Sequence, residues 1–271
     1  MNVIEHLNSD DLSSALSAAK QIIRSEPADN EARGLLAQLF CFECDWERAD
    51  KQFETLGQQN TELLVGTGLL RQLVRGEVAR KQFYQEGRMP ELAGDPDDNV
   101  SAVLDALICI REGKFADATS KLKPVHAHTE NLRGHVNGTE FTGGRDLDDI
   151  VSGYFEVLTT NGKFYWLPME KVLNITFRGY ERLQDRIWRS ASIRVEGFNT
   201  EGEVYFPVCY CCDPDVWSDR ADDQIKLGRK TDWYAATTDG PVRGMGQKLF
   251  MFGDREYSIL ELESFQGPLE E

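Results

Sequence analysis

Apolar side chains recur at helical spacing through most of the first 124 residues. In "DDLSSALSAAKQIIR" they stand at Leu12, Ala15, Ala19 and Ile22, which are three or four positions apart and share one face of a helix. Similar spacing returns in three further segments, residues 30–61, 62–94 and 99–122. The pattern predicts a helical N-terminal half.

Beyond residue 140 the pattern changes to short runs of aromatic and β-branched residues separated by Gly, Asn and Asp. We predict strands there; they cover residues 154–160, 163–169, 173–179, 192–198, 202–210 and 255–263. Asn161-Gly162 predicts a type I′ hairpin turn between the first two. Residues 124–140 are rich in Pro, Gly, His and Asn and predict a linker. The acidic segment 213–228 is either a loop or a helical connection.

A 34-residue repeat relates the helical segments. When "DDLSSALSAAK" is written above "CDWERADKQFE", Leu12 lies over Trp46 and Ala15 over Ala49. This period resembles that of the tetratricopeptide repeat, in which helices pack as antiparallel pairs. Small side chains at Ala15 and Ala49 would let neighbouring helices approach closely.

A further unit lies in "NVSAVLDALICIREGKFADATSKL", residues 99–122, whereas residues 62–94 are helical but depart from the repeat. The patterns together predict an α+β fold. Residues 1–124 would form a tetratricopeptide-like α-α superhelix, and residues 125–271 a mainly antiparallel β domain with the form of a small open barrel.

Charge narrows the possible partners. The formal net charge is −16 and the sequence pI is about 4.7. An acidic surface repels phosphate backbones and anionic lipids, so we expect neither nucleic acid nor a membrane as partner. The N-terminal residues "MNVIEHLNSDDL" lack the basic and apolar regions of a signal peptide, which favours a cytoplasmic protein.

The cysteines and histidines offer little chemistry. Cys41 and Cys44 are three residues apart near the predicted end of a repeat helix, without the preceding strand of a redox pair or the second ligand pair of a zinc site. We interpret them as scaffold. His126, His128 and His135 lack a local carboxylate or cysteine that would complete a metal site. We predict no metal, no cofactor and no catalytic residue.

The stretch "GRMPELAGDPDDNV", residues 87–100, resembles a connector of the ImpE family, the SciE- or TagJ-type accessory proteins of bacterial type VI secretion. Asn99 departs from the family, where an aromatic residue is commoner at this position. Physically the stretch is interpreted as a rigid connector, with prolines fixing turns and Asp97 or Asp98 capping the next helix. The likeness continues through residues 151–177, 183–193, 228–233 and 244–250.

This resemblance implies a non-catalytic adaptor. Members of the family are accessory factors that bind a helical segment of the small subunit of the contractile sheath. A repeat superhelix fits this role because such folds bind peptides or helices in a groove. The alternative is an enzyme or small-ligand-binding protein with its site in the β domain and the helices as a recruitment arm.

The repeat template predicts which residues would face a partner. Positions on the concave face of two units are occupied by Gln38, Phe42, Val103, Leu107, Ile110 and Arg111. We expect them to receive the apolar face of an amphipathic helix, while the acidic rim attracts its basic residues. An apolar stripe at helical spacing is also typical of a packed core, and Val103 and Leu107 have this second interpretation.

Overall fold

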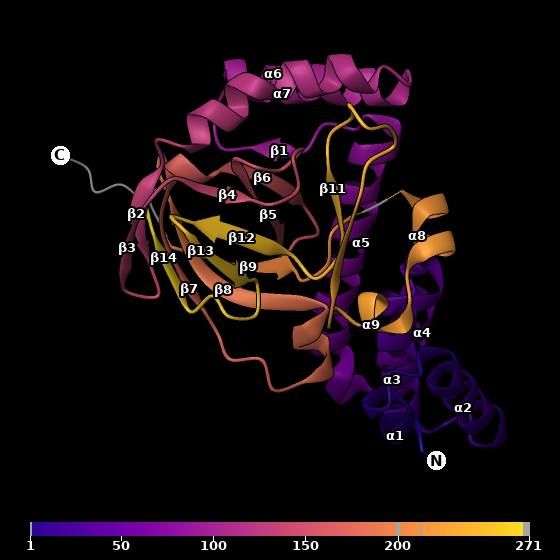
Figure 1. Cartoon of the computed structure of the whole chain (residues 1–271). Coiled ribbons are helices and arrows are strands. Elements are labelled where there is room, and N and C mark those ends of the chain that lie inside the picture. Colours follow the sequence, from indigo (N-terminus) through magenta and orange to yellow (C-terminus); the bar gives the residue numbers. More distant parts are fainter. Residues whose placement is uncertain (1, 199–200, 212, 268–271) are drawn as a thin grey trace.

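The computed structural model describes residues 2–198, 201–211 and 213–267, and its N-terminal part is a row of helices (Figure 1). They are α1 (Val3–Asn8), α2 (Leu12–Ser25), α3 (Asn30–Phe42), α4 (Trp46–Gln59), the short 3-10 helix η1 (Thr61–Leu63) and α5 (Leu64–Glu86). Ala15 and Ala49, the small residues of the repeat, are both fully buried. The close helix packing that the repeat requires is therefore present in this part of the fold.

Aspartates fix where several helices begin. The side chains of Asp11, Asp29, Asp45 and Asp97 each accept a hydrogen bond from the backbone N–H three residues further on. These bonds satisfy amides that have no partner within the helix and place a negative charge at the positive end of the helix dipole. Asp97 is thus the cap of the helix that follows the Pro-rich connector.

A second pair of helices, α6 (Asp98–Arg111) and α7 (Phe115–Thr129), lies over one end of the sheets (Figure 1). The prediction of a linker at residues 124–140 is wrong, because α7 contains Pro124 and continues to Thr129. Val125 and Thr129 are buried and extend the apolar spacing of Ala118 and Leu122. Packing of this face outweighs the unfavourable proline.

The described residues contain fourteen strands, one between α5 and α6 and thirteen after α7. They are β1 (Glu91–Leu92), β2 (Arg133–Val136), β3 (Thr139–Thr142), β4 (Gly144–Asp146), β5 (Tyr154–Thr159), β6 (Phe164–Pro168), β7 (Val172–Phe177), β8 (Trp188–Val195), β9 (Gly202–Pro207), β10 (Thr231–Tyr234), β11 (Arg243–Gly246), β12 (Leu249–Phe252), β13 (Arg255–Ser258) and β14 (Ser264–Gln266). Two short helices, α8 (Pro214–Arg220) and α9 (Asp223–Lys226), occupy the acidic connection.

The strands form a large sheet and two small ones. The large sheet has the order β1-β6-β5-β9-β8-β7-β14-β2-β3, and all its neighbours are antiparallel except the β1–β6 pair. A three-stranded sheet has the order β13-β12-β4, and β10 pairs with β11. A helical N-terminal region followed by a mostly antiparallel β region confirms the predicted α+β class. In the described part of the chain no helix is long and apolar enough to cross a lipid bilayer.

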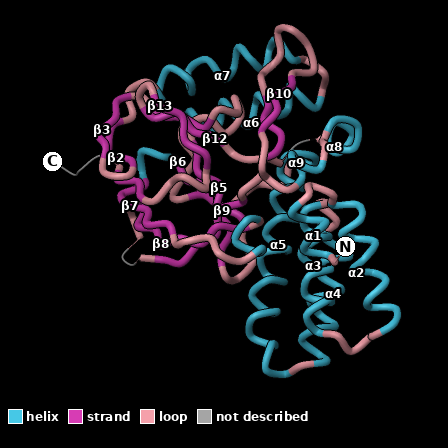
Figure 2. The backbone as a smooth tube through the Cα atoms, turned by 60° about the horizontal axis from the view of Figure 1, so that its bottom comes forward, coloured by secondary structure: helices cyan, strands magenta, loops and turns pink. Residues whose placement is uncertain are grey.

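Both faces of the large sheet are buried at strand β5. Phe155 and Val157 pack into a core with residues of β7, β8 and β12, whereas Tyr154 and Leu158 belong to the core shared with the helices. At Gly76 of α5 an added Cβ would lie 2.9 Å from a methyl group of Leu158, so glycine allows close approach of helix and sheet. Helix α5 therefore lies between helices α1–α4 and the sheet (Figure 2).

The hairpin between β5 and β6 has a different turn from the predicted one. Gly162 has φ of 80°, but Asn161 is not in the left-handed region that a type I′ turn requires. The amide of Gly162 bonds to the carbonyl of Thr159 at 3.0 Å, which indicates a type I turn followed by a glycine bulge. In the predicted strand 255–263, only the first residues, Arg255–Ser258, are a strand.

Candidate partner-binding cavity between helices and sheet

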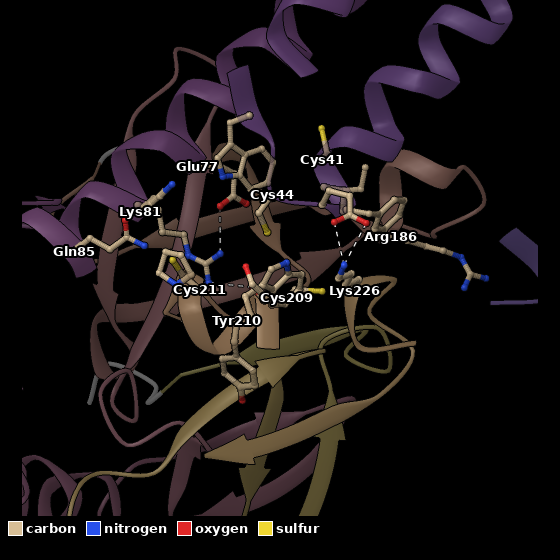
Figure 3. Close-up of a pocket in the computed structure, with 18 residues that line it drawn as sticks. Cys41, Cys44, Glu77, Lys81, Gln85, Arg186, Cys209, Tyr210, Cys211 and Lys226 are labelled. Atoms are coloured by element: carbon tan, nitrogen blue, oxygen red, sulfur yellow. Dashed lines mark hydrogen bonds and ion pairs between the residues drawn. The ribbon is translucent and has the colours of Figure 1, made fainter. Parts of the chain in front are cut away.

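A cavity of about 190 Å³ opens where the helices meet the β region. Its walls come from the end of α3, the start of α4, the C-terminal half of α5, the segments just before β8 and just after β9, and α8 and α9 (Figure 3). The lining residues are Cys41, Phe42, Glu43, Cys44, Trp46, Glu77, Arg80, Lys81, Gln85, Arg186, Ile187, Cys209, Tyr210, Cys211, Pro214, Trp217, Ser218 and Lys226. Because both halves of the chain contribute, whatever occupies the cavity contacts both.

The turn from α3 to α4 shapes one wall. Helix α3 ends at Phe42, and Cys44 has φ of 55° in the left-handed region. Cys44 therefore lies outside α3 and does not share a helix face with Cys41, although both cysteines line the cavity. Glu43 in the same turn pairs with Lys226 Nζ at 3.1 Å, which ties this turn to α9.

Buried charges form the base of the cavity. Arg80 on α5 donates two hydrogen bonds to Glu156 on β5, from Nε to Oε1 at 3.0 Å and from Nη2 to Oε2 at 2.7 Å. Glu77 accepts a bond from Trp188 Nε1 at 3.0 Å and pairs with Arg80 at 3.3 Å. Burial disfavours ionisation of Glu156, but the charges of Arg80 and Lys248 outweigh it and hold its pKa well below its usual range.

The network extends behind the cavity. Lys248 Nζ lies 3.0 Å from Glu156 Oε2 and 2.7 Å from Asp146 Oδ2. Asp146 also accepts a bond from the Tyr210 hydroxyl at 2.8 Å. These side chains are buried and compensate one another's charge, as buried ionised groups require. They hold α5, β5 and the segment before β12 in one arrangement.

Three of the four cysteines that line the cavity are poor nucleophiles. Burial raises the pKa of Cys209 to about 12 and that of Cys211 to about 11, and it raises the pKa of Cys41 well above its usual value. Thiols with such pKa values stay protonated at neutral pH, whereas metal binding and nucleophilic attack need the thiolate. Among the described residues, no group of three or more His, Cys, Asp or Glu side chains is arranged to hold a metal ion.

The histidines of the expected linker make ordinary contacts within the fold. His126 Nε2 lies 3.1 Å from the carbonyl oxygen of Asp149, and His128 pairs with Glu170. His135 is on β2, opposite Glu140 of β3. The first two side chains thus tie α7 to the segments around the sheet.

The six residues predicted to face a partner lie in two separate places. Phe42 is buried and lines the cavity, and Gln38 is half-buried one turn before it on α3. The other four are on α6, whose position at the far end of α5 separates them from α3 (Figure 1). On α6, Val103 and Leu107 are buried, Ile110 is half-buried and Arg111 is exposed. Whether these residues contact a partner stays a prediction.

The sequence analysis missed most of the cavity. Trp46 was recognised only as a repeat position, and Trp217 stands in an acidic connection with no motif around it. Lys81 and Gln85 are one turn apart on α5, the helix that departs from the repeat. No residue pattern distinguishes Lys81 and Gln85. The sequence feature that could have drawn attention to them is their place in the helix that departs from the repeat.

The fold and the cavity define a class: a protein in which repeat-like helices are docked on an antiparallel β region, with a binding cavity where the two meet. Known proteins share this plan. The family model for "ImpE protein" matches residues 138–266. The type VI secretion system accessory component TagJ of Pseudomonas aeruginosa is 25% identical over 258 residues, which cover 95% of this chain and 88% of TagJ.

A solved structure agrees with these matches. The crystal structure of protein VPA1032 from Vibrio parahaemolyticus superposes with a TM-score of 0.89 and 26% identity, covering 99% of this chain and 98% of that one. The similarity therefore extends over both the helices and the sheets. These matches confirm the resemblance to ImpE- and TagJ-type proteins that the sequence had implied.

Proposed function

We propose that this protein is a non-catalytic accessory factor of bacterial type VI secretion that binds a helical segment of the small sheath subunit. The observation that carries the proposal is the similarity to TagJ over 95% of the chain, which includes both sides of the cavity. Protein interfaces commonly centre on a large anchor side chain that fills a well-packed pocket, and the aromatic walls of this cavity suit such an anchor.

The cavity suits one anchoring side chain of a partner helix. Its volume of about 190 Å³ is somewhat larger than a 150 Å³ apolar cavity that accommodates benzene. Phe42, Trp46 and Trp217 supply apolar wall, and an amphipathic helix lying across the opening would place one large side chain inside. The helix would then contact α5 on one side and α8 on the other.

The alternative, an enzyme or small-ligand-binding protein, has less support in the geometry. Both carboxylates that line the cavity are engaged, Glu77 by Trp188 and Arg80, and Glu43 by Lys226. The buried thiols are protonated at neutral pH. A general acid or base must be free to exchange a proton with a substrate, so these groups favour binding over catalysis.

Binding to the purified small sheath subunit of the same organism tests the proposal. Size-exclusion chromatography and isothermal titration would detect the complex, and peptides tiling the helices of that subunit would identify the segment. Gln85→Trp should fill the cavity mouth and weaken binding at least about tenfold. Glu86→Trp, exposed on the next position of α5, is the matched control and should bind as the parent does.

The outcomes separate clearly. Binding lost in the Gln85 variant and kept in the Glu86 variant supports both the partner and the cavity. Binding that both variants retain would move the contact to another surface. No complex with the sheath subunit at any tested concentration would refute the proposed function.

A further inference from the structure

The cavity has a charge opposite to that of the whole protein. Four basic side chains line it, Arg80, Lys81, Arg186 and Lys226, against the two acidic ones of Glu43 and Glu77. The chain as a whole carries a formal net charge of −16. A local excess of positive charge on an acidic protein marks a place where an anionic group is favoured.

Several polar side chains at the cavity have unused hydrogen-bond donors. Arg80 and Lys226 are already paired, but the Lys81 ammonium makes no hydrogen bond or ion pair with any described residue. Gln85 lies one helical turn further along α5 and is likewise unengaged in the described part of the chain. Figure 3 shows Lys81 and Gln85 together on one rim, and Arg186 on the other with its guanidinium extending outward.

A buried donor in the wall also lacks an acceptor. Trp217 is 8% exposed, and its Nε1 is a buried atom without a hydrogen-bond partner among the described residues. An unpaired buried N–H costs free energy, so Trp217 adds an unpaired donor to this wall.

We infer that the cavity binds a protein segment in which a large apolar side chain is followed or preceded, within one helical turn, by a carboxylate. The apolar side chain would enter between Phe42, Trp46 and Trp217, and the carboxylate would accept bonds from the donors at the rim. This rests on the proposed function for the identity of the partner, but the chemistry follows from the cavity itself. The inferred segment, which carries a carboxylate, differs from the partner expected from the sequence, a helix whose basic residues are attracted to an acidic rim.

Random peptides displayed on phage, about 15 residues long so that they can form a helix, are a suitable probe. Selected peptides would be synthesised and their affinities measured by fluorescence anisotropy. We expect enrichment of an aromatic or branched apolar residue with Asp or Glu within four positions. Replacing that acid by Lys should weaken binding at least about tenfold.

Protein variants link the selection to the cavity. Lys81→Glu should lower affinity for the selected peptides at least about tenfold. Lys81→Arg, which keeps the positive charge, should bind them about as tightly as the parent does. Lys123→Glu, with the same change in charge on the exposed face of α7, is the matched control and should leave affinity unchanged. Gln85→Trp should abolish selection by occupying the mouth.

Three results would overturn the inference: no enrichment, enrichment of apolar residues without acids, or equal affinity for the Lys81→Glu variant. Failure of the proposed function is a different result, since acidic peptides would then be selected while the sheath subunit does not bind. If the sheath subunit binds normally to the Lys81→Glu variant, the function stands and this inference fails.

Discussion

Asp146 shows how strongly burial determines the properties of a single side chain in this protein. It is fully buried, and desolvation raises its pKa to about 6, with Lys248 opposing the shift and Asp148 adding to it. The sequence has 46 acidic residues, so nothing distinguishes this one before the fold is known. Only the structure brings Asp146 next to Lys248, which is 102 residues away along the chain.

The raised pKa of Asp146 predicts a pH effect on stability. A proton binds this group more tightly in the folded state than in the unfolded one, where its pKa is near 3.8. Its contribution to the free energy of unfolding is therefore complete below about pH 4 and is lost as the pH rises to about 6. Asp146→Asn removes this contribution.

Urea unfolding at a series of pH values measures the effect. Relative to the parent, the Asn variant should gain free energy of unfolding between about pH 4 and pH 6, and the difference should be constant above pH 7. A difference that does not change with pH would show that Asp146 has the same pKa in the folded and unfolded states, and a change in the opposite direction would show that folding lowers its pKa.

At the scale of elements, local spacing predicted the long helices and the central strands. The 34-residue repeat placed Ala15 and Ala49 at buried positions because close helix packing leaves room only for small side chains. Trp166 and Trp188 are both buried in the core that the sheet shares with the helices. Prediction from the sequence failed where tertiary packing outweighed a local signal. The local pattern predicts Pro124 in a linker, but it lies within α7.

Short edge elements were missed for a related reason. Strand β1 has two residues, and it exists because the connector lies beside β6 with Leu92 opposite Trp166. Such pairing depends on neighbours that are distant in the chain, and two residues carry no periodicity. The candidate cavity could not be predicted either, since its walls come from segments between residues 41 and 226 that only the fold brings together.

Helix α6 provides a test of the packing. Leu107 is 2% exposed, whereas its neighbour Ile108 is 47% exposed. Leu107→Asp should lower the free energy of unfolding by about 3–5 kcal/mol, because it removes buried apolar surface and buries a carboxylate. Ile108→Asp, the control on the same helix, should change it by less than about 0.5 kcal/mol.

Thermal or urea unfolding gives the comparison for both variants. If Leu107→Asp unfolds like the parent, the residue is not held in the core in solution. It would then be available to a partner, as the repeat template predicted for Leu107. Equal and large losses in both variants would instead indicate that α6 is sensitive to any acidic substitution.

At the scale of the whole molecule, α5 joins the two parts of the chain. On one side Arg71 pairs with Asp50 of α4 at 2.7 Å, and on the other Arg80 pairs with Glu156 of β5 at 2.7 Å. The Arg71 pair is half-exposed and is expected to contribute little, whereas the Arg80 pair is buried. The relative placement of helices and sheet, and with it the shape of the cavity, therefore depends on the buried pair.

Arg80→Met tests this dependence. The variant leaves the buried carboxylates of Glu77 and Glu156 without their shared cation, which should cost about 3–5 kcal/mol of unfolding free energy. The double variant Arg80→Met/Glu156→Gln removes one of the uncompensated charges and leaves Lys248 paired with Asp146. It should therefore be more stable than the single variant.

Arg75→Met, at an exposed position on the same helix, is the control and should stay within about 0.5 kcal/mol of the parent. In urea unfolding we expect Arg75→Met to be the most stable of the three variants, the double variant to be less stable, and Arg80→Met to be the least stable. A single variant as stable as the double one would mean that Glu156 is satisfied by Lys248 and Tyr84 alone. Apolar contacts such as Gly76 with Leu158 would then be what docks α5 on the sheet.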